Sequence, residues 1–299
     1  MKGAEISSVF RKIQGRFPVF YAWYEAMHTR LDVVLCGENE KAARSVAGRI
    51  YEMIFHLSQG LNRFDPGSEI YKINHLAGSE AVPVNPELWD ILTDALDASG
   101  RTGSFFDIRV DSECEPYPGD PGIIMDEASR TIRFSNPAIH LDLGGYAKGY
   151  ALEKARGIIL KSEISGALLS FGNSSVLALG DRPMGSGWLI GVEHPLGNRP
   201  PVLEIPLNSE SMSTSGNSSR NPVHIYSPLE RTFVRGLKMV TVVSSSVLEA
   251  EIFSTAVMAC RSVDEMKDLL KKAAFVSKAY YITYQEDSGE LTGIIPLKL

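Results

Sequence analysis

Residues 139–151 combine three features that together could hold an anion. Asp142 stands between two leucines, so alternation along a strand would turn its carboxylate away from their side chains. Gly144 and Gly145 follow and allow the backbone to turn sharply and to approach a ligand closely. Lys148 comes next, in the first turn of a predicted helix, where free backbone amides already attract anions. The stretch favours an anionic ligand such as a phosphate.

A purely structural interpretation of this stretch stays open. A strand, two glycines and a helix form a common connection, and Asp142 could simply cap the helix. The spacing matches neither the Walker phosphate loop nor the dinucleotide G-x-G-x-x-G motif. The residues alone therefore make the anion site a hypothesis.

A second candidate site lies on the helix predicted over residues 247–258. Glu251 and Thr255 are four residues apart, so they share one helix face. Both side chains offer the hard oxygen atoms that Mg²⁺ favours. A solvent-exposed face, or a threonine bonded back to its own helix, explains the pair equally well.

Two further stretches place polar or aromatic groups where a ligand could meet them. Phe105, Phe106 and Asp107 follow a predicted helix over 88–99 and could hold a planar heterocycle, although such phenylalanines are often core residues. Residues 211–217 supply hydroxyl groups and a glycine after a strand, and a solvated turn is the alternative there.

Apolar periodicity predicts the elements that must position these residues. Besides the helices already named, helices are expected over 2–17, 39–62 and 263–274, after Ser68, and from Tyr146 onward, with a hairpin over 122–133. Strands are expected over 31–35, 167–173, 176–180, 187–192, 202–207, 237–244 and within 279–295. We therefore expect an α+β fold with mixed sheets and helices packed against one side.

Composition narrows the function classes. The 299 residues carry a net charge of −6, which argues against a general nucleic-acid binder, so an anion needs a local positive site or a metal. Cys36, Cys114 and Cys260 form no zinc pattern, and buried or free thiols are expected. The sequence contains no run of about 18 apolar residues, so no membrane span is expected. The first residues lack a signal-peptide pattern, so a cytoplasmic protein is expected.

Taken together, these segments resemble the ApbE family of FAD:protein FMN transferases, from about Met27 to about Met258. Asp142-Leu143-Gly144-Gly145-Tyr146-Ala147-Lys148-Gly149-Tyr150-Ala151 is similar to the family's central motif. Four more motifs follow the family's order: Arg63-Phe64-Asp65-Pro66-Gly67-Ser68-Glu69 with Ile73-Asn74, Phe106-Asp107-Ile108, Thr214-Ser215-Gly216, and His224-Ile225 with Pro228. Met27 matches the methionine of a further short motif.

The resemblance implies a single ApbE-like domain over residues 1–299, in which the flavin lies in a cleft between two lobes. Members bind FAD with Mg²⁺, cleave its pyrophosphate, release AMP, and join the FMN half to a threonine of an acceptor flavoprotein. Family members are often exported lipoproteins, in contrast to the cytoplasmic location expected from this sequence.

The same resemblance implies roles for individual residues. The flavin and adenosine parts would meet Met27, Phe64, Phe105, Phe106, Asp107, Thr214 and Ile225. Asp142 and Lys148 would hold the ligand, with Lys148 also stabilising charge during catalysis. His224 would bind the ligand and take the proton from the acceptor hydroxyl. The backbone oxygen of Gly145 and the side chains of Glu251 and Thr255 would hold the metal.

Several positions depart from the family pattern. Glu251 replaces an aspartate and is one methylene longer, and Ser227 replaces an aspartate after the histidine. Arg109 replaces a threonine, Glu230-Arg231 replace Thr-Gly, and residues 172–174 replace Gly-Gly-Asp. Two alternatives therefore stand beside the transferase: a non-catalytic FAD-binding protein, and a pyrophosphatase that hydrolyses FAD to FMN and AMP.

Overall fold

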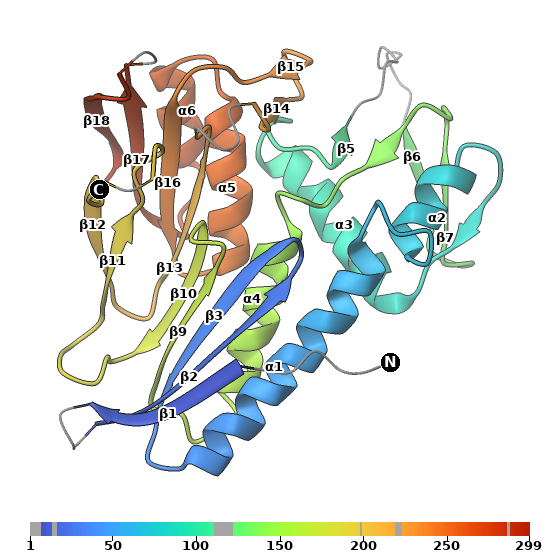
Figure 1. The fold of residues 1–299 in the computed structure, drawn as a ribbon. Coiled ribbons are helices and arrows are strands. Elements are labelled where there is room, and N and C mark those ends of the chain that lie inside the picture. The colour runs from blue at the N-terminus through green and yellow to red at the C-terminus, as the bar shows by residue number, and fades with distance from the viewer. Residues whose placement is uncertain (1–6, 14–16, 111–121, 198, 219–222, 286–287) are drawn as a thin grey trace.

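A nine-stranded antiparallel sheet forms the framework of the protein (Figure 1). The structure is a computed structural model that describes residues 7–13, 17–110, 122–197, 199–218, 223–285 and 288–299. The strands, in spatial order, are β1 (Ser7–Ile13), β2 (Phe17–Ala26), β3 (Thr29–Cys36), β9 (Gly166–Phe171), β10 (Ser175–Gly180), β13 (Ser211–Gly216), β16 (Lys238–Ser244), β17 (Val276–Tyr284) and β18 (Leu291–Lys298).

Four helices cover one face of this sheet: α1 (Glu40–Leu61), α4 (Ala147–Ile159), α5 (Val247–Ala259) and α6 (Val263–Lys271). Their buried side chains form the main core together with inward-facing strand residues such as Val33 and Leu169. The hairpin of β11 (Trp188–Val192) and β12 (Leu203–Leu207) closes a second, smaller core on the opposite face. The α+β prediction is confirmed.

The helix ends follow from local sequence chemistry. The Asn39 side chain accepts a hydrogen bond from the Ala42 amide at the start of α1, as expected for a helix cap. Helix α5 differs, since most of its residues are buried between the sheet and its neighbouring helices. A predominantly apolar helix fits that position.

A smaller part of the fold lies beyond α1 on the helix side of the sheet (Figure 1). It contains α2 (Glu69–Leu76), α3 (Pro86–Arg101) and the short strands β4 (Val82–Pro83), β5 (Arg109–Val110), β6 (Ile123–Asp126), β7 (Thr131–Phe134) and β8 (His140–Leu141). Ser68 caps α2 and Asn85 caps α3, and β6 pairs with β7, as predicted. A short hairpin of β14 (Tyr226–Ser227) and β15 (Thr232–Phe233) lies near the top of α5 in the same view.

One prediction about secondary structure is wrong. Among residues 2–17, the described part is strand β1 and the first residue of β2 rather than an amphipathic helix. Its apolar side chains satisfy a strand because β2 offers a complete antiparallel partner, with Phe10 opposite Phe20. The alternative of a solvated turn over residues 211–217 is excluded, since residues 211–216 form β13 between β10 and β16 in the sheet.

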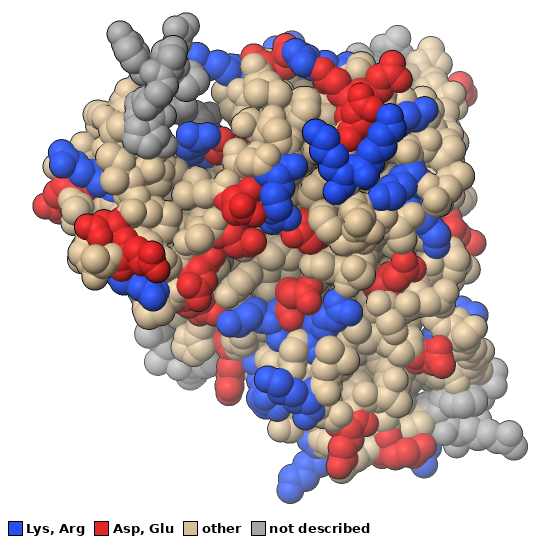
Figure 2. All heavy atoms as spheres, turned by 180° about the vertical axis from the view of Figure 1, so that it is seen from behind, with Lys and Arg blue, Asp and Glu red and all other residues tan. Residues whose placement is uncertain are grey.

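Surface and thiol features agree with the sequence. On the face turned away from Figure 1, acidic and basic side chains are interspersed over the described surface (Figure 2). Cys36 and Cys260 are buried free thiols, and Cys114 lies outside the described residues. Within the described chain, no helix combines the length and the apolar character needed to cross a membrane.

Candidate active site

Two adjoining open pockets, of about 290 and 340 Å³, share Asp142, Gly144 and Lys148. The first is also lined by Met27, His28, Ser58, Leu61, Asn62, Arg63, Phe64, Leu143 and Ala147. The second is also lined by Phe105, Phe106, Asp107, Gly145, Ser174, Thr214, Ser215, His224, Ile225, Tyr226, Pro228, Glu251 and Thr255. The structure thus brings every candidate site residue into one continuous cleft, although the chain separates them by more than two hundred positions.

The central motif forms the wall between the two pockets. Asp142 follows β8, and its Oδ1 atom accepts a hydrogen bond of 2.8 Å from the Gly144 amide. Its Oδ2 atom lies 3.5 Å from Nη2 of Arg63. Asp142 therefore does not cap α4. The cap position is Tyr146, which makes no side-chain cap hydrogen bond, so no capping side chain competes with an anion for the first-turn amides.

Glu251 is the most buried acid of the second pocket, with its side chain 4% exposed. Lys148 donates to its Oε1 atom, forming an ion pair between α4 and α5. The hydroxyls of Ser175 and Ser213 donate to the other oxygen, the latter at 2.9 Å. Because β10 and β13 pair Ser175 with Ser213, the two hydroxyls meet the carboxylate side by side.

Gly145 and Thr255 lie against each other in the same pocket. A Cβ atom on Gly145 would lie 3.3 Å from Oγ1 of Thr255 and 3.3 Å from the Phe106 ring. The Thr255 hydroxyl is also 3.2 Å from that of Ser215. A side chain at residue 145 would crowd this contact, so the backbone of Gly145 can approach a ligand there only because the residue is glycine.

These groups suit a hard divalent cation. Glu251, Thr255 and the carbonyl of Gly145 offer a carboxylate, a hydroxyl and a backbone oxygen, the donors that Mg²⁺ prefers. The Lys148 ammonium already places a positive charge against the Glu251 carboxylate. In the described part of the chain, no three His, Cys, Asp or Glu side chains gather as a metal cluster. A metal here would therefore depend on hydroxyl and backbone oxygens as well.

The first pocket offers an aromatic edge. Phe64 is 69% exposed, and the Arg63 guanidinium lies 4.7 Å above its ring. The His28 ring meets Phe64 edge-on, at 6.5 Å between centroids. Met27 and His28 both adopt positive φ angles, 49° and 61°, in the turn between β2 and β3. Such a turn in non-glycine residues is strained, and strain of this kind concentrates at functional sites.

The three residues Phe105, Phe106 and Asp107 have distinct environments. Phe106 is buried in the main core, as the alternative of a core phenylalanine predicted. It also lines the second pocket. Asp107 is held by Arg109, whose Nε atom donates to Oδ1 at 2.9 Å and whose backbone amide donates to the same oxygen at 2.8 Å. Arg109 therefore fixes the orientation of the Asp107 carboxylate.

Sequence reasoning assigned no role to several residues that line the cleft or orient it. Arg63 pairs with Asp142, which is 79 positions away, and no spacing rule links them. Ser175 and Ser213 were overlooked because their role appears only when β10 and β13 pair around Glu251. His28 and Tyr226 carry no sequence signal of a role, and they line the first and the second pocket respectively.

Fold and cleft together define an α+β protein in which an aromatic pocket opens into a pocket of carboxylate, hydroxyl and lysine groups. The chain belongs to the ApbE family, whose sequence model matches residues 27–278. It is 24% identical over 270 residues to a FAD:protein FMN transferase of Klebsiella pneumoniae, covering 78% of this chain and 83% of that protein. It is 25% identical over 280 residues to the FAD:protein FMN transferase of Chlamydia muridarum, covering 81% and 83%.

Solved structures show the same fold. The ApbE protein of Thermotoga maritima superposes with a TM-score of 0.76 at 22% identity, covering 93% of this chain and 96% of that one. The flavin transferase ApbE of Vibrio cholerae gives a TM-score of 0.76 at 15% identity, covering 98% and 97%.

Proposed function

We propose that the protein is a Mg²⁺-dependent FAD:protein FMN transferase. The acceptor threonine hydroxyl attacks the FMN phosphorus of FAD, a new oxygen–phosphorus bond forms, and the pyrophosphate bridge breaks to release AMP. The observation that carries this proposal is the convergence of Lys148, Glu251, Thr255 and Gly145 in a pocket that continues into the aromatic pocket of Phe64. Family membership and the names of the relatives support it.

Glu251, Thr255 and the carbonyl oxygen of Gly145 would hold Mg²⁺. Bound there, Mg²⁺ would supply positive charge against the phosphates of FAD. Lys148 borders both pockets, so its ammonium can turn from Glu251 toward a pyrophosphate that spans them. Phosphoryl transfer depends mainly on such positioning and charge neutralisation.

His224 provides the base. It lines the second pocket together with Thr214, whereas Phe64 lines the first. Imidazole accepts a proton near neutral pH, so it can take the proton of the acceptor hydroxyl as the new bond forms. Asp142, fixed by Arg63 and by the Gly144 amide, would orient the ligand between the pockets.

The ring systems of FAD need flat, apolar surfaces. Phe64, Met27 and His28 offer one in the first pocket, and Phe105 offers another in the second. Phe106, Asp107, Thr214 and Ile225 would complete the walls around the ligand. The acceptor flavoprotein, the cytoplasmic location and the treatment of residues 1–299 as one domain stay predictions.

One observation favours a second candidate, a non-catalytic FAD-binding protein. Ser227, which replaces an aspartate of the family, is buried, and its hydroxyl donates to the Ala259 carbonyl at 3.4 Å. Its side chain is thus committed to the fold. The protein would then bind FAD in the same cleft without transferring FMN.

The test is incubation of the purified chain with FAD, Mg²⁺ and an acceptor flavoprotein domain, followed by a denaturing gel and chromatography of released nucleotides. A fluorescent acceptor band that disappears with chelator, or when the acceptor threonine is replaced by valine, supports the transferase. AMP release without a labelled acceptor indicates FAD hydrolysis. Tight FAD binding with neither product, for two different acceptors, indicates the binding protein.

A further inference from the structure

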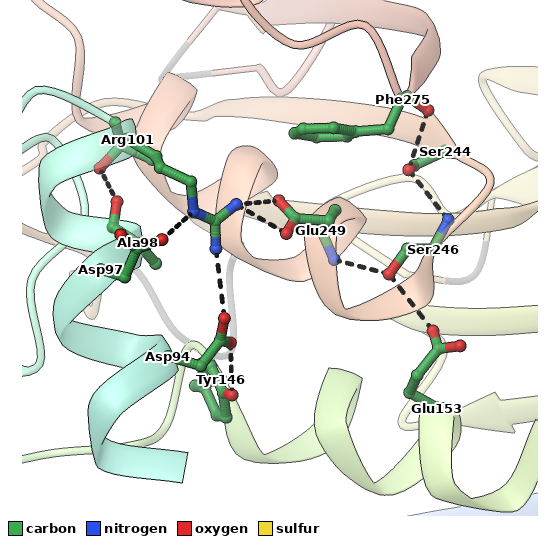
Figure 3. Close-up of polar contacts among 11 residues, drawn as sticks. Asp94, Asp97, Ala98, Arg101, Tyr146, Glu153, Ser244, Ser246, Glu249 and Phe275 are labelled. Carbon is green, nitrogen blue, oxygen red and sulfur yellow. Dashed lines mark hydrogen bonds and ion pairs between the residues drawn. The ribbon is translucent and has the colours of Figure 1, made fainter. Parts of the chain in front are cut away.

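A branched ion-pair network connects α3 to both helices that flank the candidate metal site (Figure 3). Its centre is Arg101, the last residue of α3. The Nη1 atom of Arg101 donates to both carboxylate oxygens of Glu249, at 2.7 and 2.8 Å. Its Nη2 atom lies 3.5 Å from Asp94, and its Nε atom donates to Asp97 at 2.7 Å.

Each of two branches ends on a different helix. Glu249 lies in the first turn of α5. Asp94 accepts a hydrogen bond of 2.6 Å from the hydroxyl of Tyr146, which is the N-cap residue of α4. One guanidinium group therefore links α3, α4 and α5. The branch to Asp97 stays within α3.

Both attachment points lie beside candidate site residues. Residues two positions apart in an α-helix are separated by about 200° around its axis, so Glu249 and Glu251 face opposite sides of α5. Arg101, which binds Glu249, therefore contacts the side of α5 opposite to the side that carries Glu251. Tyr146 directly follows Gly145 and precedes Lys148 by two positions. None of the network's five residues lines the second pocket, so the network contacts both segments without entering that pocket.

The network is also shielded enough to matter. The Arg101 side chain is 31% exposed, that of Glu249 is 18% exposed, and Tyr146 is buried. Nη1 of Arg101 alone contacts both Glu249 oxygens, while Nη2 and Nε face Asp94 and Asp97, so the planar guanidinium group binds carboxylates in three fixed directions. Burial raises the pKa of Glu249, and the charge of Arg101 opposes that rise. Without Arg101, a mostly buried carboxylate would lose its partner.

We propose that Arg101 is a positioning residue that sets α4 against α5 and so aligns Gly145 and Lys148 with Glu251 and Thr255. This inference rests on the proposed function, since the aligned groups are those that would hold Mg²⁺ and the pyrophosphate. A role limited to joining the smaller part of the fold to the sheet is the competing explanation.

The experiment compares the full-length chain with Arg101→Met and Arg101→Lys. Methionine keeps much of the apolar part of the arginine side chain without its charge. Lysine keeps the positive charge without the planar guanidinium group. Two readouts are the Mg²⁺ concentration that half-saturates FAD binding, followed by flavin fluorescence, and the thermal midpoint of unfolding. Asp97→Asn is the matched control, because it removes a contact of Arg101 that stays within α3.

Arg101→Met is expected to raise the half-saturating Mg²⁺ concentration by about tenfold or more, the usual effect of losing an outer partner of a metal site. Transfer at saturating Mg²⁺ is expected to recover, so KM for the metal changes more than kcat. Arg101→Lys should fall between the wild type and Arg101→Met, and Asp97→Asn should match the wild type.

If Arg101→Met fails to fold, Tyr146→Phe replaces it in the test. This variant loses only the hydroxyl that binds Asp94, and it should raise the half-saturating Mg²⁺ concentration by a smaller factor. A lower unfolding midpoint with an unchanged Mg²⁺ requirement in these variants would overturn the inference and leave Arg101 a structural link. A wild-type chain whose FAD binding and transfer ignore Mg²⁺ would instead refute the proposed function, and this inference with it.

Discussion

The ammonium group of Lys148 and the carboxylate of Glu251 form an ion pair across the contact between α4 and α5. The pair is largely enclosed, with the lysine side chain 22% exposed and the glutamate side chain 4% exposed. Under the proposed function, a metal ion bound at Glu251 would compete with this lysine for the same carboxylate. An FAD pyrophosphate would relieve the competition by offering Lys148 a second anion, so FAD and Mg²⁺ are expected to bind cooperatively.

Replacement of Lys148 by glutamine should separate these two roles. Without FAD, the variant is expected to bind Mg²⁺ about tenfold more tightly, because a positive charge that repels the cation from Glu251 has been removed. Transfer of FMN should nevertheless fall, by about 100-fold or more, for loss of the cation that stabilises the phosphates. Calorimetric titration with Mg²⁺ and the gel assay measure the two effects.

Lys154→Gln is the matched control for this prediction. Lys154 lies on the same helix and pairs with the exposed Glu87 instead. Both its Mg²⁺ affinity and its transfer rate should equal those of the wild type. Weaker Mg²⁺ binding in Lys148→Gln would contradict the competition between lysine and metal.

Gly149→Ala should destabilise the protein although alanine usually favours a helix. A Cβ atom at this position would lie 2.8 Å from Cβ of Glu251 and 3.0 Å from Cα of Leu248, so α4 and α5 must move apart. Overpacking of this kind costs about 1–3 kcal/mol, more than the roughly 1 kcal/mol of helix propensity gained. Urea unfolding should show the loss, and Mg²⁺-dependent transfer should fall because Glu251 is displaced.

Gly157→Ala in the same helix tests the opposite sign. A Cβ atom there meets nothing within 4 Å, so only the propensity term remains. The variant is expected to gain about 0.5–1 kcal/mol in unfolding free energy, without a change in transfer. Equal effects of the two substitutions would mean that the close contact between α4 and α5 does not govern stability.

The predictability of this fold depended on whether a signal was local. Helix α1 follows from apolar residues spaced three and four apart, so a helix over 39–62 was predicted from sequence. Strand β13 was missed because its serines and threonine look like a solvated turn, whereas Ser213 and Thr214 bond to Glu251 and Thr241 inside the fold. Strand β1 was missed because a short apolar pattern fits a helix until β2 supplies its partner.

The candidate site shows the same division. Lys148 and Glu251 were selected by residue type and spacing and Phe64 through the family resemblance, and the structure places all three around the two adjoining pockets. Arg63 and Arg101 act through carboxylates far away in the sequence, to which no motif or spacing connects them. The Arg101–Glu249 pair follows only from the packing of α3 against α5, and the Arg63–Asp142 pair only from the approach of the segment after α1 to the segment after β8.

Phe64→Ala is expected to weaken FAD binding while leaving stability almost unchanged, because the ring is 69% exposed and contributes little to the core. Stacking of a planar base on an aromatic ring is worth about 1–3 kcal/mol, which corresponds to an affinity loss of roughly 5- to 150-fold. Fluorescence titration with FAD measures the change. Phe64→Trp should restore binding.

Phe55→Ala serves as the comparison for Phe64, since Phe55 is 42% exposed on α1 and lines neither pocket of the cleft. Its FAD affinity should equal that of the wild type. If both alanine variants lost affinity to the same extent, Phe64 would act on the fold rather than on the ligand.

The last prediction concerns pH and the pair of Arg101 and Glu249. Burial raises the pKa of Glu249, with smaller contributions from Asp94 and Asp97, and Arg101 lowers it. Arg101→Met should therefore raise the pKa of Glu249 further. The folded variant then holds a proton that the unfolded chain has already lost, so stability falls as pH rises through the folded pKa. For a single titrating group, the unfolding free energy can change by at most about 1.4 kcal/mol per pH unit.

The destabilisation caused by Arg101→Met should consequently be larger at about pH 8 than at about pH 5, as measured by urea unfolding at each pH. Adding Glu249→Gln to this variant removes the titrating carboxylate, and the pH dependence of the difference from wild type should shrink accordingly. A destabilisation that grows toward acid pH would mean that Glu249 is not the group that Arg101 stabilises. A pH-independent destabilisation would show that the charge pair contributes little and that Arg101 acts through packing.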